Sequence, residues 1–286
     1  MNLNEKTTFR IAILDLYEGF ENQGMRCLRD IIKQFGEAQQ LNIILDEFDV
    51  RLKNEVPDVS YDVYISSGGP GNPVESKGSE WERHYFNWLK EMEKWNDDEG
   101  NLQKKYVFFI CHSFQLVCRH WELANVCARK STSFGVFPIH LLEGVDEPVF
   151  SGMNDPFYAV DSRDYQVIEP RMNIVYKNAT ILCIEKDRPH LTHLNYERAI
   201  MGIRFSEYFI GTQFHPEADP IGMSMYLQTD AKKKSVIDNH GQEKWESMIE
   251  QLNDPDKIKW TYSHILPNFL NIALQSLVSL SLVQQF

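Results

Sequence analysis

Short apolar runs alternate with longer amphipathic segments over the first 123 residues of the chain. The apolar runs are expected to be β-strands, since they are nearly continuous or alternate with a period of two; they are 9–16, 47–52, 61–66 and 106–110. Apolar residues recur at helical spacing in the segments between or after these runs; these are 22–35, 80–95 and 113–123. Strands separated by helices predict βαβ units and a mostly parallel sheet with helices on both faces.

The second half of the chain has a different pattern. Its apolar runs are short and closely spaced, which suggests an antiparallel extension of the sheet; they are 157–160, 180–184, 199–205 and 208–214. Residues from about 220 onward have a helical pattern, with Pro255 and Pro267 as expected helix boundaries. We therefore expect an α/β fold with a small antiparallel extension and C-terminal helices.

The charge of the chain limits the surfaces that it can bind. The 286 residues carry a formal net charge of −12, whereas nucleic acid and anionic membranes require a basic surface. The run Lys232-Lys233-Lys234 is a local exception, which we interpret as a solvated helix face. The most apolar segment, 269–283, is interrupted by polar residues and is not expected to span a membrane. We predict neither a nucleic-acid nor a membrane partner.

The cysteines indicate the compartment. They are five in number, which is odd, and they fit no metal-binding spacing. The N-terminus has no apolar segment of the kind that secretory signals contain. Free thiols in a reducing cytoplasm are therefore expected. The sequence also has no phosphate-binding glycine loop, so neither a metal nor a cofactor is predicted.

Cys111 differs from the other cysteines in its position. It directly follows the predicted strand 106–110 and precedes a predicted helix, at the edge of the sheet where open α/β folds bind ligands. A helix N-terminus favours the thiolate form of a cysteine, and the backbone N–H of His112 would point toward an oxyanion. A buried structural role is the alternative, and it is our interpretation of the other four, Cys27, Cys118, Cys127 and Cys183.

A histidine and a glutamate follow the last apolar run of the second half. In the sequence His215-Pro216-Glu217, the proline favours an extended backbone at His215. Residues two apart in an extended chain project to the same side. Glu217 can therefore reach His215 Nδ1 and leave Nε2 free to face a thiol, as in a catalytic triad.

A glycine-rich turn follows the predicted strand 61–66. The turn Gly68-Gly69-Pro70-Gly71 can bring a backbone N–H close to a developing oxyanion, because glycine lacks a Cβ that would clash. Considered alone, such a segment is more simply an ordinary turn. Together with Cys111 and His215 at other strand ends, it predicts a cysteine-dependent acyl-transfer site.

These three segments resemble the class I glutamine amidotransferases. Motifs of that family are Gly-x-Cys-x-Gly-x-Gln, Gly-x-Gln-Phe-His-Pro-Glu and Gly-Gly-Pro. The segment 211–217 matches the second motif in full, 68–71 matches the third, and the first retains Cys111 and Gln115. The resemblance covers roughly residues 9–217. It implies a flavodoxin-like open, mostly parallel sheet and one amidotransferase-like domain over 1–286, with 220–286 as a C-terminal helical elaboration.

The resemblance also implies a mechanism. Cys111 would attack the side-chain amide of glutamine, form a γ-glutamyl thioester and release ammonia. His215 would act as base and then as acid, with Glu217 orienting it. The backbone N–H groups of Gly69 and His112 would form the oxyanion hole.

Other residues are implied as substrate contacts. Gln115 would hold the bound substrate. The segment 161–165 falls where the family has a loop that contacts the main-chain groups of the substrate, which implicates Ser162, Arg163 and Asp164. In this family the ammonia normally passes to a synthase, and none is evident in the sequence, so a separate synthase subunit is the expected partner.

The sequence departs from the family next to the nucleophile. Phe109 and Ser113 replace the two glycines of the first motif, and Phe114 stands where many members have histidine. Segment 161–165 also lacks the Ser-His pattern that is common in the family. Two alternatives therefore remain beside the amidotransferase: an independent cysteine hydrolase of γ-glutamyl conjugates, and a non-catalytic protein with the same fold.

Overall fold

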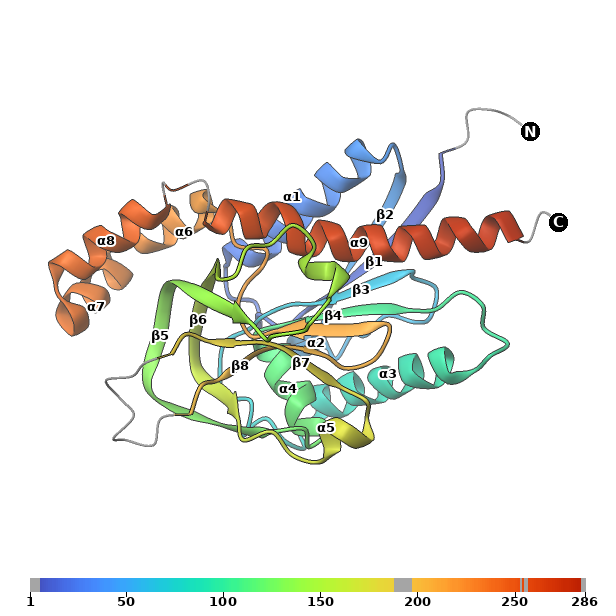
Figure 1. The fold of residues 1–286 in the computed structure, drawn as a ribbon, viewed down its shortest axis with the longest axis horizontal. Helices are drawn as coiled ribbons and strands as arrows, with labels where there is room; N and C mark the ends of the chain where they lie inside the picture. The colour runs from blue at the N-terminus through green and yellow to red at the C-terminus, as the bar shows by residue number, and fades with distance from the viewer. Residues whose placement is uncertain (1–5, 188–196, 253, 255–256, 284–286) are drawn as a thin grey trace.

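A nine-stranded sheet forms the centre of the computed structural model (Figure 1), which describes residues 6–187, 197–252, 254 and 257–283. The strand order is β2-β1-β3-β4-β9-β8-β7-β5-β6. The strands are β1 Thr8–Asp15, β2 Asn42–Asp49, β3 Val63–Ser66, β4 Tyr106–Ile110, β5 Asn125–Leu141, β6 Phe157–Ile168, β7 Thr180–Glu185, β8 Ile200–Arg204 and β9 Phe209–Thr212.

The sheet has a parallel half and an antiparallel half that meet at β9. Strands β2, β1, β3, β4 and β9 pair in parallel, whereas β8, β7, β5 and β6 continue the sheet by antiparallel pairing. The helices are α1 Gln23–Ala38, α2 Val50–Lys53, α3 Glu80–Asp97, α4 His112–His120, α5 Asn173–Tyr176, α6 Pro220–Leu227, α7 Asp230–His240, α8 Gln242–Leu252 and α9 Ile258–Val283, with a short 3-10 helix at Pro148–Phe150.

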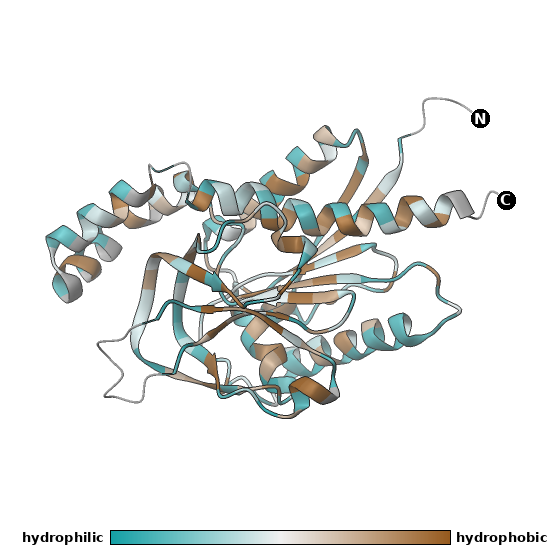
Figure 2. Cartoon of the chain, viewed as in Figure 1, coloured by the Kyte–Doolittle hydropathy of each residue, from teal (hydrophilic) through white to brown (hydrophobic). Residues whose placement is uncertain are grey.

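Each face of the sheet packs against a pair of helices. Helices α1 and α9 cover one face, where Leu28 and Phe269 are buried against the strands. Helices α3 and α4 cover the other face, where Trp88 and Phe114 are buried (Figure 1). The central strands are mostly hydrophobic along their length, as strands buried on both faces should be (Figure 2). The predicted α/β architecture is confirmed.

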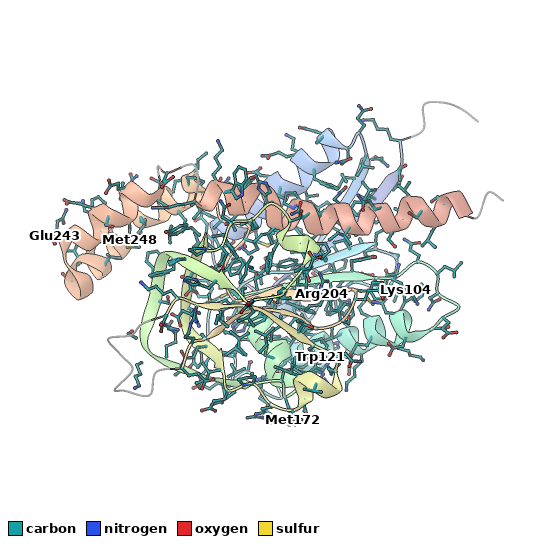
Figure 3. The ribbon with its side chains drawn as sticks, viewed as in Figure 1. Lys104, Trp121, Met172, Arg204, Glu243 and Met248 are labelled. Carbon is teal, nitrogen blue, oxygen red and sulfur yellow. The ribbon has the colours of Figure 1, made fainter. Side chains whose placement is uncertain are left out.

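The C-terminal helices form two further packing units. Helices α6 and α8 bury Leu227 and Met248 against Val136 of β5 and Val160 of β6, and Figure 3 labels Met248 on α8. Helix α9 instead crosses the sheet beside α1. Among the described residues, no helix combines the length and the apolar character that crossing a membrane requires.

Two local expectations are wrong, and one strand is not predicted from the sequence. Of the strand predicted over 47–52, only residues 47–49 lie in β2, because Asp49 caps the short helix α2 by accepting a hydrogen bond from the Leu52 N–H. Strand β5 is not predicted, because its polar first half lacks the alternating pattern of a strand. Pro267 lies inside α9 rather than at a boundary, where its neighbour Leu266 is fully buried. Pro255 lies outside the described residues.

The strand order brings the predicted site segments together. Strand β4 lies between β3 and β9, and all three are parallel. Their carboxyl ends therefore lie at the same edge of the sheet. The glycine turn follows β3, Cys111 follows β4, and His215 lies three residues beyond β9.

Candidate active site

Cys111 occupies a sharp strand-to-helix junction. Its backbone has φ 49° and ψ −95°, and α4 begins at the next residue. The Cys111 N–H donates to the Thr212 carbonyl at 2.8 Å, which ties the junction to the end of β9. A positive φ at a non-glycine residue costs about 1–3 kcal/mol and persists only where the surroundings impose it. The junction therefore has the strained geometry of a nucleophile elbow.

Ser113 holds this elbow in place. Its Oγ accepts a hydrogen bond from the Ile110 N–H at 2.8 Å and lies 2.8 Å from the Ser66 carbonyl, to which it donates. The hydroxyl thus bridges the ends of β3 and β4 where direct backbone pairing stops. Behind it, Ser66 Oγ and the Tyr85 hydroxyl are hydrogen-bonded at 2.8 Å. A serine at this glycine position therefore adds hydrogen bonds that the family's glycine cannot make.

Replacing Ser113 by alanine should destabilise the protein. The change leaves the buried Ile110 N–H and Ser66 carbonyl without their hydroxyl partner, at a cost of about 1–3 kcal/mol in the free energy of unfolding. Urea denaturation measures this cost. Ser281→Ala is a matched control, because the Ser281 hydroxyl bonds a backbone carbonyl on an exposed part of α9. Equal stability of the two variants would contradict the bridging role.

His215 and Glu217 adopt the arrangement predicted for a base and its orienting carboxylate. The His215 N–H donates to the Val160 carbonyl at 2.8 Å, which fixes the extended backbone of the histidine against β6. His215 Nδ1 lies 2.8 Å from Glu217 Oε1. Glu217 is only 1% exposed. Nε2 is therefore left for the thiol side of the ring.

The surroundings of His215 favour its protonated form. Burial alone would lower its pKa, but the charges of Glu217 and Cys111 and hydrogen bonds to both side chains outweigh burial. The net effect raises the pKa of His215 well above its ordinary value. The surroundings of the ring therefore stabilise the imidazolium form of His215.

The glycine turn after β3 lies directly against this pair. A Cβ at Gly68 would lie 2.9 Å from His215 Cε1 and 3.6 Å from Cys111 Cβ. A Cβ at Gly69 would overlap the Leu16 carbonyl oxygen. Both positions therefore require glycine for close approach, which explains why the turn can place its backbone beside the nucleophile.

Two glutamine side chains connect the nucleophile to β6. Gln115 Nε2 donates to Gln213 Oε1 at 3.0 Å and to the Tyr165 carbonyl at 3.2 Å. Gln213 Nε2 in turn lies 3.6 Å from Cys111 Sγ. Sequence reasoning assigned no role to Gln213, although it belongs to the motif that contains His215. Its position in that motif was the available signal.

The segment 161–164 meets the site through its backbone. Cys111 Sγ lies 3.7 Å from the Ser162 carbonyl oxygen. The Arg163 side chain is buried and pairs with Asp161 at 2.8 Å and with Glu185 at 3.6 Å. Asp164 is exposed and accepts a hydrogen bond from Thr132. Only Ser162 is thus brought to Cys111, and the substrate contacts of Arg163 and Asp164 stay predictions.

Tyr17 is a second residue that sequence reasoning missed. It follows β1 at the same edge of the sheet, and a Cβ at Gly68 would lie 3.3 Å from its hydroxyl. Burial, together with the charges of Glu217 and Cys111, raises the pKa of Tyr17 well above its ordinary value. Its hydroxyl is therefore a neutral hydrogen-bond donor beside the triad at neutral pH.

The two phenylalanines near Cys111 do not point to the nucleophile. Phe109 and Phe114 are fully buried in the core on the α3–α4 face, where both pack against Phe205. Cys111 belongs to the core on the opposite face. A Cβ at Gly211 would lie 3.0 Å from Phe109 Cβ, so glycine on β9 accommodates the larger residue on β4. The core therefore accommodates phenylalanine at position 109 without a change beside Cys111.

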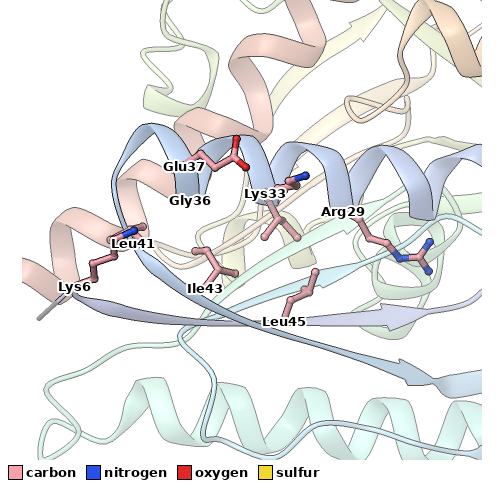
Figure 4. Close-up of a pocket in the computed structure, with 9 residues that line it drawn as sticks. Lys6, Arg29, Lys33, Gly36, Glu37, Leu41, Ile43 and Leu45 are labelled. Atoms are coloured by element: carbon pink, nitrogen blue, oxygen red, sulfur yellow. The ribbon is translucent and has the colours of Figure 1, made fainter.

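Two hollows of the described surface lie away from these residues. A cavity of about 290 Å³ lies between α1 and β2 (Figure 4), and one of about 340 Å³ lies around Pro148. Neither is lined by a predicted site residue. Within the described part of the chain, no group of three histidine, cysteine, aspartate or glutamate residues could hold a metal ion.

The arrangement at the carboxyl edge has the parts that acyl transfer requires. It combines a thiol at a helix N-terminus, an imidazole of raised pKa, a buried carboxylate on the far ring nitrogen and a glycine turn. These are the components of covalent catalysis by an activated cysteine.

Comparisons with known proteins identify the family of the chain. The family model described as glutamine amidotransferase class-I matches residues 13–231. No curated protein matches the chain. Among solved structures, a glutamine amidotransferase from Thermotoga maritima is 17% identical, with a TM-score of 0.65, and the match covers 93% of this chain and 97% of the other.

Two further solved structures have the same fold. A putative GMP synthase subunit from Thermoplasma acidophilum is 14% identical, with a TM-score of 0.56 and coverage of 99% of this chain and 100% of the other. The glutaminase domain of Trypanosoma brucei CTPS, with bound acivicin, is 15% identical, with a TM-score of 0.51 and coverage of 75% and 89%. Because the family model spans most of the residues, the chain belongs to the class-I glutamine amidotransferase family.

Proposed function

We propose that this protein hydrolyses the side-chain amide of glutamine through a γ-glutamyl thioester on Cys111 and releases ammonia. The observation that carries the proposal is the convergence of three segments at the ends of adjacent strands. Cys111 after β4, His215 beyond β9 and the Gly68–Gly69 turn after β3 lie in mutual contact range. Membership of the amidotransferase family supports glutamine as the substrate.

In the first half-reaction the Cys111 thiolate attacks the amide carbon. A C–S bond forms, and the electron pair of the C=O π bond moves to the oxygen. The oxyanion accepts hydrogen bonds from the backbone N–H groups of Gly69 and His112. When the tetrahedral intermediate collapses, the C–N bond breaks and protonated His215 gives its Nε2 proton to the leaving nitrogen, which departs as ammonia.

In the second half-reaction water replaces the nitrogen. Neutral His215 takes a proton from a water molecule as its oxygen attacks the thioester carbon. The C–S bond then breaks, glutamate leaves, and the thiolate–imidazolium pair is restored. Glu217 stabilises the imidazolium in both steps through its 2.8 Å contact with Nδ1.

The substrate contacts follow from residues near the thiol. Gln115 is held by Gln213 and by the Tyr165 carbonyl, so its amide is fixed at the site. Ser162 presents its backbone beside Cys111 Sγ. Together with Arg163 and Asp164, these residues are proposed to recognise the main-chain groups of glutamine.

A separate synthase subunit is the proposed receiver of ammonia. One structural neighbour is named as a subunit of GMP synthase, and that chain is fully covered by the match. We propose that residues 1–286 act as one amidotransferase unit that includes the helices after 220, since these helices pack on the same sheet. The free cysteines support a cytoplasmic location, where Cys111 stays reduced.

Exposure to a glutamine-like diazoketone tests the proposal. We expect ammonia release from glutamine, and mass spectrometry should show one covalent adduct on Cys111. Glutamine in excess should slow the labelling. A thiol that reacts with small alkylators but not with the diazoketone, in a protein that releases no ammonia from glutamine, would refute the proposal.

Hydrolysis of γ-glutamyl conjugates is the alternative activity for the same cysteine. Such conjugates share the α-amino and α-carboxylate groups of glutamine and differ only at the amide nitrogen, so turnover measurements distinguish the two activities. Turnover of γ-glutamyl amides with little turnover of glutamine would identify this activity.

A further inference from the structure

Arg51 connects the glycine turn to the end of β1. It lies in α2, and its Nη1 donates to the Pro70 carbonyl at 2.6 Å and to the Leu16 carbonyl at 3.3 Å. Its Nη2 pairs with Glu18 at 2.7 Å. The Arg51 side chain is only 11% exposed, although this position has no role in the predicted triad.

The surroundings of the guanidinium limit its movement. The ring of Trp81 lies 5.3 Å from Arg51 Cζ, on the side of α3. A Cβ at Gly71 would lie 3.4 Å from Arg51 Nη2. The Leu16 carbonyl, which Arg51 bonds, also contacts Gly69 at the point where a Cβ would stand. Arg51 thus joins the two backbone segments that meet at Gly69.

The charge of Arg51 also affects His112, the residue that follows Cys111. His112 is almost completely buried, and burial followed by the charges of Arg51 and Arg119 lowers its pKa to about 3. His112 is therefore neutral at physiological pH. The backbone N–H of His112 is the second proposed oxyanion donor, and the side chain of the same residue is influenced by the Arg51 charge.

We propose that Arg51 is a positioning residue for the oxyanion hole: it holds the Gly69 turn against β1 so that the Gly69 N–H faces the oxygen of the carbonyl group that Cys111 attacks. This role rests on the proposed function. Hydrogen bonds aimed at developing charge act mainly in the transition state. Loss of Arg51 should therefore lower kcat far more than it raises KM.

The expected fall in kcat is that of an enzyme with one misplaced oxyanion donor. Arg51→Met should lower kcat for glutamine hydrolysis by about 10- to 100-fold, with KM changed by less than about threefold. Arg51→Lys should recover part of the loss, because one ammonium cannot replace a planar guanidinium that bonds two carbonyls and a carboxylate. Arg204→Met is the matched control. Arg204, labelled in Figure 3, likewise pairs with a glutamate. It lies at the end of β8 beside the start of β9, at the edge of the sheet opposite the site.

Two measurements separate this role from a general effect on folding. The first is hydrogen–deuterium exchange in peptides that span 67–72, which needs no substrate; we expect roughly tenfold faster exchange in Arg51→Met and unchanged exchange in Arg204→Met. The second is inhibition by the aldehyde analogue of glutamine. Addition of Cys111 Sγ to the aldehyde carbon forms a hemithioacetal whose oxygen occupies the oxyanion hole. Its inhibition constant should rise in proportion to the fall in kcat.

The possible outcomes test the positioning role of Arg51 and the proposed function separately. Unchanged exchange in 67–72 for both Arg51 variants would overturn the positioning role. Faster exchange with unchanged kcat and unchanged aldehyde inhibition would show that the turn moves without affecting the oxyanion, and would also overturn it. A wild-type protein that neither hydrolyses glutamine nor binds the aldehyde would refute the proposed function instead, and exchange would still decide whether Arg51 holds the turn.

Discussion

Replacement of Cys111 by alanine will reduce glutamine hydrolysis by at least about 10⁴-fold. The proposed reaction has no route to the γ-glutamyl thioester without the sulfur, and loss of a nucleophile that acts with its base typically costs about 10⁶-fold in kcat. Cys111→Ser should be almost as inactive, because the strained junction positions the side chain for a thiolate and a serine hydroxyl does not ionise at neutral pH.

Ammonia release at saturating glutamine measures this effect. Cys127→Ser is the matched control, because Cys127 is also a free cysteine but lies on β5, where its sulfur contacts Gln166. That variant should keep full activity. Cys111→Ala with wild-type turnover of both glutamine and γ-glutamyl amides would exclude a catalytic role for this cysteine and support the non-catalytic alternative.

Much of this site could be predicted because its parts are local in sequence. Each of Cys111, His215 and the Gly68–Gly69 turn follows an apolar run, and parallel strands bring such ends to one edge. The contact of His215 with Glu217 also follows from local geometry, since residues two apart in an extended chain share a side. The observed 2.8 Å contact agrees with this expectation.

The remaining parts depend on tertiary neighbours that no local pattern identifies. The place of Arg163 in the segment 161–165 predicts a contact with the substrate, but a strand exposes alternate residues to alternate faces. Arg163 therefore shares the face of Asp161, with which it pairs, while the backbone of Ser162 meets Cys111. Ser113 is a similar case, since its bridge to Ser66 depends on the position of β3 beside β4.

The effect of Phe109, a large residue at a position where the family has glycine, also depends on tertiary neighbours. Phe109 replaces a glycine that family members carry, which in sequence suggests a change at the nucleophile. The pleat of β4 sends its side chain to the α3–α4 face, where Gly211 of β9 leaves room for it. The Phe109 side chain therefore lies away from Cys111 because of packing between adjacent strands, which a single sequence does not reveal.

Glu217→Gln should lower kcat by roughly 10²- to 10⁴-fold while leaving the fold intact. A neutral amide cannot stabilise the imidazolium as a carboxylate does. When its NH₂ group donates to Nδ1, the ring keeps its proton on Nε2, and Nε2 can no longer accept a proton on the Cys111 side. Of the two charges that raise the pKa of His215, that of Glu217 has the larger effect, and this replacement removes it. The pKa of His215 should therefore fall toward its ordinary value, which NMR titration of the His215 Cε1 proton measures.

The same change gives a signed dependence of stability on pH. In the wild type the pKa of His215 is raised above the unfolded value of about 6.5. Its contribution to the unfolding free energy is therefore complete below about pH 6.5 and is lost as the pH rises through the folded pKa. The stability difference between wild type and Glu217→Gln should accordingly be largest near pH 6 and shrink at alkaline pH, as urea denaturation across this range would show.

Glu147→Gln distinguishes this effect from the loss of any buried carboxylate. Glu147 is also buried and pairs with Arg204 at the opposite edge of the sheet. Its replacement should lower stability without changing the pKa of His215 or the turnover of glutamine. If Glu217→Gln and Glu147→Gln had the same turnover and the same His215 titration as the wild type, the 2.8 Å contact would be a structural pair and the base would act without an orienting carboxylate. A fall in turnover confined to Glu217→Gln, together with the lowered pKa of His215, would identify that contact as part of the catalytic machinery.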